Sequence, residues 1–208
     1  MFFIFTCTSF LAGRTIHYIS RGISPRRLKQ TTRSSATDHK VEQTSLMQNP
    51  DAIVIGAGIV GASAALSLTN AGLKVLVIDR GAVSSGTTGA GEGNILVSDK
   101  DPGPELTLAL RSRDLWFEMQ EDVGDTFELE AKGGVVVARN DAGPLMKLAS
   151  EQSRHGVEIQ NLDHGSLHEL EPFLDQKYQT GVFYPQDAQC QPMLAAAHVI
   201  RTVVLRGG

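Results

Sequence analysis

Three glycines with the spacing G-x-G-x-x-G, at Gly56, Gly58 and Gly61, are the residues of this chain whose type and spacing most directly suggest chemistry. They follow a short apolar run and open a helical pattern, and Asp79 comes about 20 positions further on, after a second apolar run. A glycine turn lets a pyrophosphate approach the backbone, and a helix N-terminus attracts negative charge. The spacing therefore predicts a dinucleotide-binding site.

Each of these four residues has its own physical reason. Gly56 permits the tight turn from strand to helix, Gly58 leaves room for the pyrophosphate, and Gly61 lets the helix pack closely on the strands. Asp79 can accept hydrogen bonds from ribose hydroxyls and would repel a 2′-phosphate, so a preference for NADP is not expected. The glycines by themselves also fit a strand–turn–helix that binds no ligand.

The elements that must position these residues form a strand–helix–strand unit. The apolar runs Ala52–Ile55 and Val75–Ile78 are typical of buried parallel strands. Between them, apolar residues at helical spacing predict a helix over 59–71 that is stopped by Gly72. The segment 84–94, rich in Gly, Ser and Thr, is by composition a loop. Its many N–H and hydroxyl donors favour a loop that wraps a cofactor.

The rest of the chain departs from regular strand–helix alternation. A helix opened by Pro104 is expected through about Asp122, and Ser166–Glu169 fits a capping box for a short helix. The other expected elements are a β-hairpin of 127–129 with 135–138, a helix over 145–155, strands over 157–159 and 181–184, and a last helix over 192–206. This order predicts a nucleotide-binding start interrupted by an inserted substrate domain.

Composition places the chain among ordinary globular proteins, because its 208 residues are 41% hydrophobic and 20% charged. A net charge of −4 gives no reason to expect a nucleic-acid partner, and no apolar run has the roughly 18 residues of a transmembrane span. Only two cysteines occur, so a disulfide framework is not expected. His164 and His168 lack a third ligand in register, so no metal site is predicted.

The first 37 residues differ from the remainder, since they contain none of the 23 Asp and Glu but six of the 19 Lys and Arg. They are also rich in Ser and Thr, a composition that favours a mitochondrial transit peptide. A secretory signal and an unstructured extension of a cytoplasmic protein remain open as alternatives. Residues 38–50 are polar and are expected to form a linker.

Over about residues 50–206, the chain resembles the FAD-dependent amine and amino-acid oxidoreductases, the relatives of D-amino-acid oxidase, glycine oxidase and sarcosine oxidase. The resemblance rests on the fingerprint and on Ala65 and the Asp79–Arg80 pair, which favour FAD. Weaker motifs then follow in the family's order: the loop 84–94, Gly133-Gly134-Val-Val-Val137, Leu170-Glu171-Pro172 and 181–192.

This resemblance implies FAD as the cofactor and assigns residues to it by position. The pyrophosphate would be held by Gly56, Gly58, Ile59, Val60 and Gly61. Asp79 and Arg80 would lie near the adenosine ribose. The residues expected toward the ribityl chain and the flavin ring are Ser85, Thr87, Thr88, Gly91, Gly93 and Asn94.

The implied fold is α/β, a Rossmann-like FAD-binding βαβ start with an interleaved α+β substrate domain, apparently truncated because relatives are longer. The expected parts are a leader and linker over 1–50, a FAD-binding portion over 51–125, part of the substrate domain over 126–190 and a return helix over 191–208.

The implied function is oxidation of a small amino or imino acid, with hydride transfer from the amine-bearing carbon to flavin N5. The alternatives are a non-catalytic nucleotide-binding fragment that needs a partner chain for the missing half, and another flavoprotein such as a monooxygenase. The sequence identifies no catalytic residue.

Overall fold

The computed structural model describes residues 5–11, 14–20 and 49–208. Its contacts divide the chain into two compact units, which are described separately. The first unit comprises Met1–Ile23 and Gly91–Leu194, and the second comprises Ser24–Ala90 and Ala195–Gly208.

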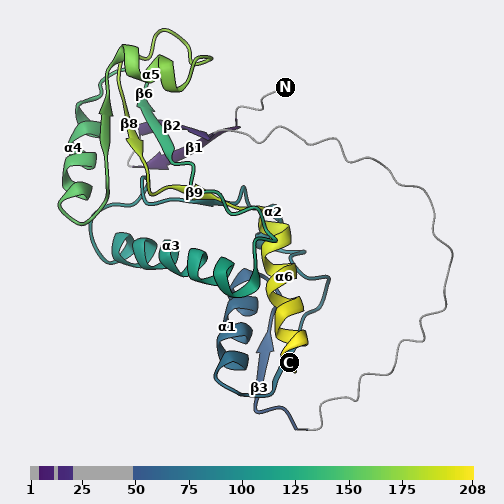
Figure 1. Cartoon of the computed structure of the whole chain (residues 1–208). Helices are drawn as coiled ribbons and strands as arrows, with labels where there is room; N and C mark the ends of the chain where they lie inside the picture. The colour runs from purple at the N-terminus through teal and green to yellow at the C-terminus, as the bar shows by residue number, and fades with distance from the viewer. Residues whose placement is uncertain (1–4, 12–13, 21–48) are drawn as a thin grey trace, which may run out of the picture. The chain divides into compact units, whose positions relative to one another are not determined.

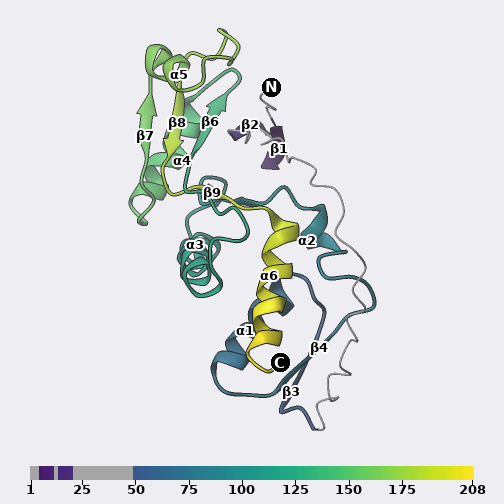
Figure 2. The same cartoon turned by 45° about the vertical axis from the view of Figure 1, so that its right-hand side comes forward.

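The second unit contains the predicted strand–helix–strand motif, formed by β3 (Ala52–Ile55), α1 (Ile59–Asn70) and β4 (Val75–Ile78). The two strands pair in parallel, and Figure 2 shows them side by side. Parallel neighbours need a crossover connection, which α1 supplies. The helix ends where Gly72 takes a φ of +85°, so the expected C-terminal glycine is confirmed.

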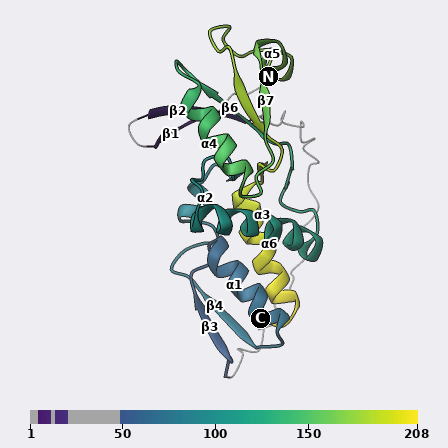
Figure 3. The same cartoon turned by 90° about the vertical axis from the view of Figure 1, so that its left-hand side faces the viewer.

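Most of α6 (Pro192–Leu205) belongs to the same unit, although the chain between α2 and Leu194 belongs to the other one. Figure 3 shows α1 and α6 close together. Their C-terminal ends are joined by a hydrogen bond from Arg206 Nη1 to Asn70 Oδ1 (2.5 Å). Both helices contribute to the core of this unit, together with the turn before α1 and with β4. Its buried apolar residues are Ala57, Ala62, Ala65, Leu66, Val75, Ala195, Ala196, Val199 and Val203.

The face of the β3–β4 pair that carries Ile53 and Ile55 is exposed. Parallel register sets Ile53 beside Leu76 and Ile55 beside Ile78, so these four side chains point the same way. They are 58%, 39%, 83% and 44% exposed, respectively. We call these four residues the outer face. Parallel strands are normally covered on both faces, so this apolar surface is unusual.

The first unit is built on an antiparallel sheet in the order β1-β2-β6-β8-β7. Its strands are β1 (Phe5–Leu11), β2 (Arg14–Ser20), β6 (Gly134–Ala138), β8 (Gly181–Tyr184) and β7 (Gln160–Leu162). Figure 1 shows α4 (Gly143–Ser153) along this sheet and α5 (His164–Leu170) at one end of it.

Strand β6 is buried on both faces, which explains its uninterrupted apolar sequence. On one face, Val136 packs in a cluster with Leu145 and Ala149 of α4 and with Leu106 of α3 (Pro104–Val123). On the other face, Val135 and Val137 pack with Leu167 of α5.

A small second sheet in the first unit pairs β5 (Asn94–Ile95) with β9 (Ala188–Gln189). Glu130 forms an isolated bridge with Gln189 on the other side of β9. The predicted β-hairpin of 127–129 with 135–138 is therefore wrong. Strand β6 pairs with β8 and β2, and the apolar side chains of Phe127 and Leu129 are buried without a hairpin.

Two smaller expectations also need correction. The strand expected at 157–159 lies at β7, three residues later, because Val157 joins the core cluster before the strand begins. The helix expected to be capped by Ser166 begins at His164, and its cap is Asp163, whose Oδ1 accepts a hydrogen bond from the Ser166 N–H (2.8 Å).

The expected linker at 38–50 lies outside the described residues, apart from positions 49 and 50, and of the leader only β1 and β2 are described. The domain boundaries expected at 125 and 190 remain predictions, and the division into compact units is a separate description of the chain. Within the described ranges, none of the helices combines the length and the apolar character that a membrane crossing needs.

Candidate functional site

The turn after β3 depends on two glycines that no other residue could replace without strain. Gly56 has a φ of +111°, in the region that side chains disfavour, and its N–H donates to Ile78 O (2.8 Å). A Cβ on Gly61 would lie 1.9 Å from Gly56 O, inside any allowed contact. Helix α1 therefore begins directly against the turn, as the fingerprint predicts.

The start of α1 meets Thr88, which comes from the short α2 (Thr87–Ala90). The Ile59 N–H donates to Thr88 Oγ1 (3.0 Å), and a Cβ on Gly58 would lie 2.9 Å from the same oxygen. Gly58 is the N-cap residue, and as a glycine it has no side chain with which to cap the helix. The Thr88 hydroxyl keeps its own proton to donate. The structure thus brings three predicted site residues together at a helix N-terminus, where an anion is favoured.

Asp79 connects the end of β4 to the same turn. Its Oδ2 accepts from the Ala57 N–H (2.7 Å), and its Oδ1 accepts from the Gly81 N–H (2.8 Å). These backbone hydrogen bonds, the Ala57 bond first, lower the pKa of Asp79 below its ordinary value of 3.8. Its carboxylate is exposed and has further lone pairs, so it can also accept from the hydroxyls of a ribose.

The loop after Asp79 contains one buried residue, Ser84, that the sequence did not single out as a site residue. Ser84 is buried with a φ of +63°, and its N–H donates to Ala57 O (3.2 Å). A Cβ on Gly81 would lie 2.8 Å from Ser85 Oγ. Arg80, Ser85 and Thr87 are exposed. A serine in left-handed conformation has no sequence signature, so Ser84 could not have been found from the sequence.

The remaining predicted site residues, Gly91, Gly93 and Asn94, fall in the first compact unit. Gly93 has a φ of +77°, and a Cβ there would lie 2.0 Å from Cys190 O. Its own carbonyl accepts from the Cys190 N–H (2.9 Å). Asn94 pairs with Gln189 in the β5–β9 sheet. Gly93 is therefore required by the close approach of Cys190, the residue after β9, a reason that is independent of any cofactor.

His164 and His168 do share a helix face, with ring centroids 4.4 Å apart. His168 Nε2 lies 3.1 Å from Tyr178 O, so one ring nitrogen of His168 has a hydrogen-bond partner within the protein. Among the residues that the structure describes, no group of three or more His, Cys, Asp or Glu could hold a metal ion.

These arrangements fit the adenosine diphosphate half of a dinucleotide. A glycine turn, a helix start whose N-cap residue is the glycine Gly58 and a carboxylate at the end of the next strand lie within one unit. The Thr88 hydroxyl, whose oxygen accepts from the Ile59 N–H, keeps a proton to donate at this position, and Asp79 is the acceptor. These residues supply groups that can bind a nucleotide. They do not include an acid paired with a nucleophile.

Comparison with known proteins agrees with this geometry. Glycine oxidase of Geobacillus kaustophilus is 29% identical over 164 residues, covering 71% of this chain and 42% of that protein. N-methyl-L-tryptophan oxidase of Yersinia pestis is 27% identical over 161 residues, covering 76% of this chain and 43% of the relative. The chain thus spans less than half the length of these relatives.

Solved structures share the fold. The glycine oxidase structure from Geobacillus kaustophilus superposes with a TM-score of 0.71 at 24% identity, covering 76% of this chain and 45% of that one. L-proline dehydrogenase from P. horikoshii superposes with a TM-score of 0.69 at 25% identity, covering 78% and 43%. The predicted Rossmann-like start with a mixed α/β continuation is confirmed.

A family model also matches this part of the chain. Residues 51–208 match the family described as DAO, FAD dependent oxidoreductase. This range begins one residue before β3 and includes every predicted site residue. The chain belongs to the DAO family of FAD dependent oxidoreductases, which confirms the family and the FAD cofactor expected from the sequence.

Proposed function

We propose that this chain forms the FAD-binding part of an oxidoreductase that oxidises a small amino or imino acid. When bound, FAD supplies the hydride acceptor, flavin N5, for the carbon that bears the amine. The observation that carries the proposal is the turn in which Gly56, Gly61 and Asp79 meet at the start of α1, within a chain of this family.

The proposed roles of the site residues follow their geometry. The backbone of Gly56, Gly58, Ile59, Val60 and Gly61 holds the pyrophosphate. The Thr88 hydroxyl, which accepts from the Ile59 N–H in the structure, donates its own proton to the phosphate. Asp79 accepts from the ribose hydroxyls, and Arg80 follows it in the chain. Ser85, Thr87, Gly91, Gly93 and Asn94 are proposed to serve the ribityl chain and the flavin ring.

The proposed substrate class rests on the relatives, which are named for the oxidation of glycine and of N-methyl-L-tryptophan. Both compounds carry an amine on the carbon next to a carboxylate. No described residue is assigned as a catalytic group, so the part of this chain in the reaction is to bind and orient.

The test is a titration of the purified chain with FAD and, separately, with NAD, followed by flavin fluorescence and by isothermal calorimetry. We expect FAD to bind and NAD to bind at least about tenfold more weakly, a difference of about 1.4 kcal/mol. Anaerobic addition of glycine, sarcosine or proline to the FAD complex then reports on substrate through bleaching of the flavin band. A folded chain that binds NAD and not FAD would refute the proposal.

A second candidate is a nucleotide-binding subunit that needs a partner chain carrying the other half of the fold. The outer face favours it, since Ile53, Ile55, Leu76 and Ile78 are exposed together on a parallel pair of strands. In this case, FAD binding and bleaching by an amino acid should appear only when a polypeptide corresponding to the second half of a glycine oxidase is added.

For localisation, we propose that residues 1–37 direct the protein to mitochondria, on the basis of their basic, acid-free composition. A fluorescent reporter fused after residue 50 should enter mitochondria, and a chain without residues 1–37 should stay in the cytoplasm. A reporter that stays diffuse in the cytoplasm would contradict this.

A further inference from the structure

The chain segment 93–98 is held along its length by a second segment, 187–190, that is distant in sequence. The Cys190 N–H donates to Gly93 O (2.9 Å), and β5 then pairs with β9, Asn94 opposite Gln189 and Ile95 opposite Ala188. Beyond the strands, the contact continues through the side chain of Asp187. Backbone pairing therefore ends at Ile95, and beyond it the Asp187 carboxyl group holds the segment by hydrogen bonds.

Asp187 is completely buried, and its Oδ1 accepts from two successive backbone N–H groups, those of Val97 (2.8 Å) and Ser98 (3.2 Å). Its own backbone is fixed as well, because its N–H donates to Tyr184 O (3.2 Å) and its carbonyl accepts from the Gly133 N–H (3.0 Å). A buried carboxyl group is costly unless it is hydrogen-bonded, so this site is built around these two N–H groups.

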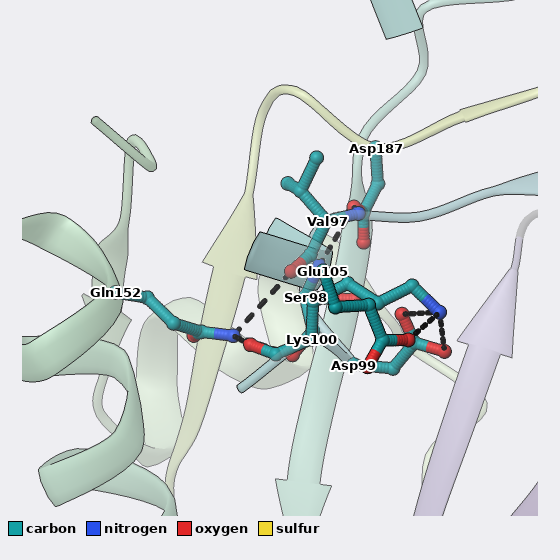
Figure 4. A network of polar contacts seen from close by, with 7 residues as sticks. All are labelled: Val97, Ser98, Asp99, Lys100, Glu105, Gln152 and Asp187. Atoms are coloured by element: carbon teal, nitrogen blue, oxygen red, sulfur yellow. Dashed lines mark hydrogen bonds and ion pairs between the residues drawn. The ribbon is translucent and has the colours of Figure 1, made fainter. Parts of the chain in front are cut away.

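The carbonyl groups of the same segment are held from the opposite side by Gln152 of α4. Its Nε2 donates to Ser98 O (3.0 Å) and Lys100 O (2.7 Å), with a longer contact to Val97 O (3.4 Å). Figure 4 shows Asp187 and Gln152 on the two sides of this backbone. Gln152 is itself fixed, because its Oε1 accepts from the Tyr184 hydroxyl (2.9 Å).

An ion-pair cluster holds the end of the segment. Lys100 Nζ lies 3.3 Å from Asp99 Oδ1 and 3.3 Å from Glu105 Oε1 in the first turn of α3. Figure 4 shows this cluster beside the hydrogen bonds of Gln152. The backbone N–H groups of Val97 and Ser98 and the backbone carbonyls of Val97, Ser98 and Lys100 therefore all have side-chain partners within the first unit.

We propose that Asp187 is a positioning residue that sets the conformation of residues 93–98 and, through Asn94, the placement of the flavin ring. The inference rests on the proposed function, in which Asn94 serves the flavin half of FAD. Asp187 is not proposed to touch the cofactor. It acts through the Val97 and Ser98 N–H groups and the adjoining β5–β9 pairing.

The experiment compares binding of ADP with binding of FAD in the full chain, by titration. ADP reports on the glycine turn and Asp79 alone, whereas the difference between FAD and ADP reports on the flavin half. For Asp187→Ala, we expect the FAD affinity to fall about tenfold relative to ADP, with ADP affinity within about twofold of the wild type. The visible circular dichroism of bound flavin should weaken, and Asp187→Asn, which keeps one acceptor oxygen, should lie between.

Glu118→Gln is the matched control, since it removes an exposed carboxylate of α3 that forms an ion pair with Arg111 (2.7 Å). It should change neither affinity nor spectrum. Equal losses of ADP and FAD binding in Asp187→Ala, or an unchanged ratio and spectrum, would overturn the inference. A wild-type chain that binds neither ligand would instead refute the proposed function, so the two failures are distinguishable.

Discussion

Asp79 Oδ2 accepts a hydrogen bond from the Ala57 backbone N–H at 2.7 Å, across 22 positions of the chain. The bond joins the carboxyl end of β4 to the glycine turn that follows β3. Two parts of the fingerprint that are separate in sequence are thereby connected before any cofactor binds. The acid has a structural role at the turn beside its proposed role at the ribose.

Replacing Asp79 by Ala should weaken FAD binding by about 10–100-fold, because it removes the ribose acceptor and loosens the Ala57 turn. Asp79→Asn, which retains one acceptor oxygen, should lose less. Calorimetric titration with FAD measures both variants. Unchanged affinity in Asp79→Ala would mean that the acid serves only the turn.

Replacing Gly58 by Val should abolish FAD binding while the chain stays folded. The new Cβ would lie 2.9 Å from Thr88 Oγ1, a side-chain atom that can move, but the rest of Val would occupy the pyrophosphate position. Gly86→Ala is the matched control, because nothing lies within 4 Å of a Cβ there. Circular dichroism checks the fold, and normal FAD binding by Gly58→Val would refute the pyrophosphate role.

Replacing Gly61 by Ala should act on stability instead. Its Cβ would lie 1.9 Å from Gly56 O, a backbone atom that cannot move without displacing α1 from the turn. We expect a loss of about 1–3 kcal/mol in the free energy of unfolding. Denaturant titration measures it, and a variant as stable as the wild type would contradict this packing.

The pKa of Asp79 predicts a pH-dependent contribution to stability. Because the folded-state pKa lies below the ordinary value of 3.8, the ionised acid stabilises the folded state at pH values above 3.8. That contribution is lost as the pH falls through the folded-state pKa. The difference in Tm between wild type and Asp79→Asn should therefore be constant near neutral pH and shrink below about pH 4. A difference that grows on acidification would contradict the hydrogen bonds to Ala57 and Gly81.

Cys190 should react slowly with alkylating reagents. Burial raises the pKa of its thiol from 9.0 to about 11, so the thiolate fraction at pH 8 falls by about 100-fold. The measurement is iodoacetamide labelling of a Cys7→Ser variant, folded and in denaturant. Equal labelling rates in the two states would mean that Cys190 is not buried in the folded chain.

The outer face should make the isolated chain self-associate. Ile55 is 83% exposed, so Ile55→Lys should raise solubility at little cost to folding. Leu108→Lys, at a 70% exposed position of α3, is the control for a general effect of charge. Light scattering of the wild type, Ile55→Lys and Leu108→Lys measures how strongly each protein self-associates. If Ile55→Lys also abolishes rescue by the second-half polypeptide, the outer face is the partner surface.

Local sequence determined the strand–helix–strand motif and its glycines. Gly56, Gly61 and Gly72 have conformations or contacts that only glycine meets, and short-range apolar spacing fixes β3, α1 and β4. Such features depend on residues near one another in the chain, so they can be predicted from the sequence without knowledge of the fold. The family resemblance then supplied FAD.

Tertiary structure decided which segments pair and what the loop residues do. Strand β6 pairs with β8 instead of with 127–129, because both of its faces are buried and its partner is chosen by packing. Gly93 was predicted from its position in a glycine-rich loop, but the approach of Cys190 requires it. Asp187 reaches Val97 across 90 positions, and no local pattern could have indicated it. A buried polar contact depends on which distant backbone groups lack partners, and only the folded chain specifies them.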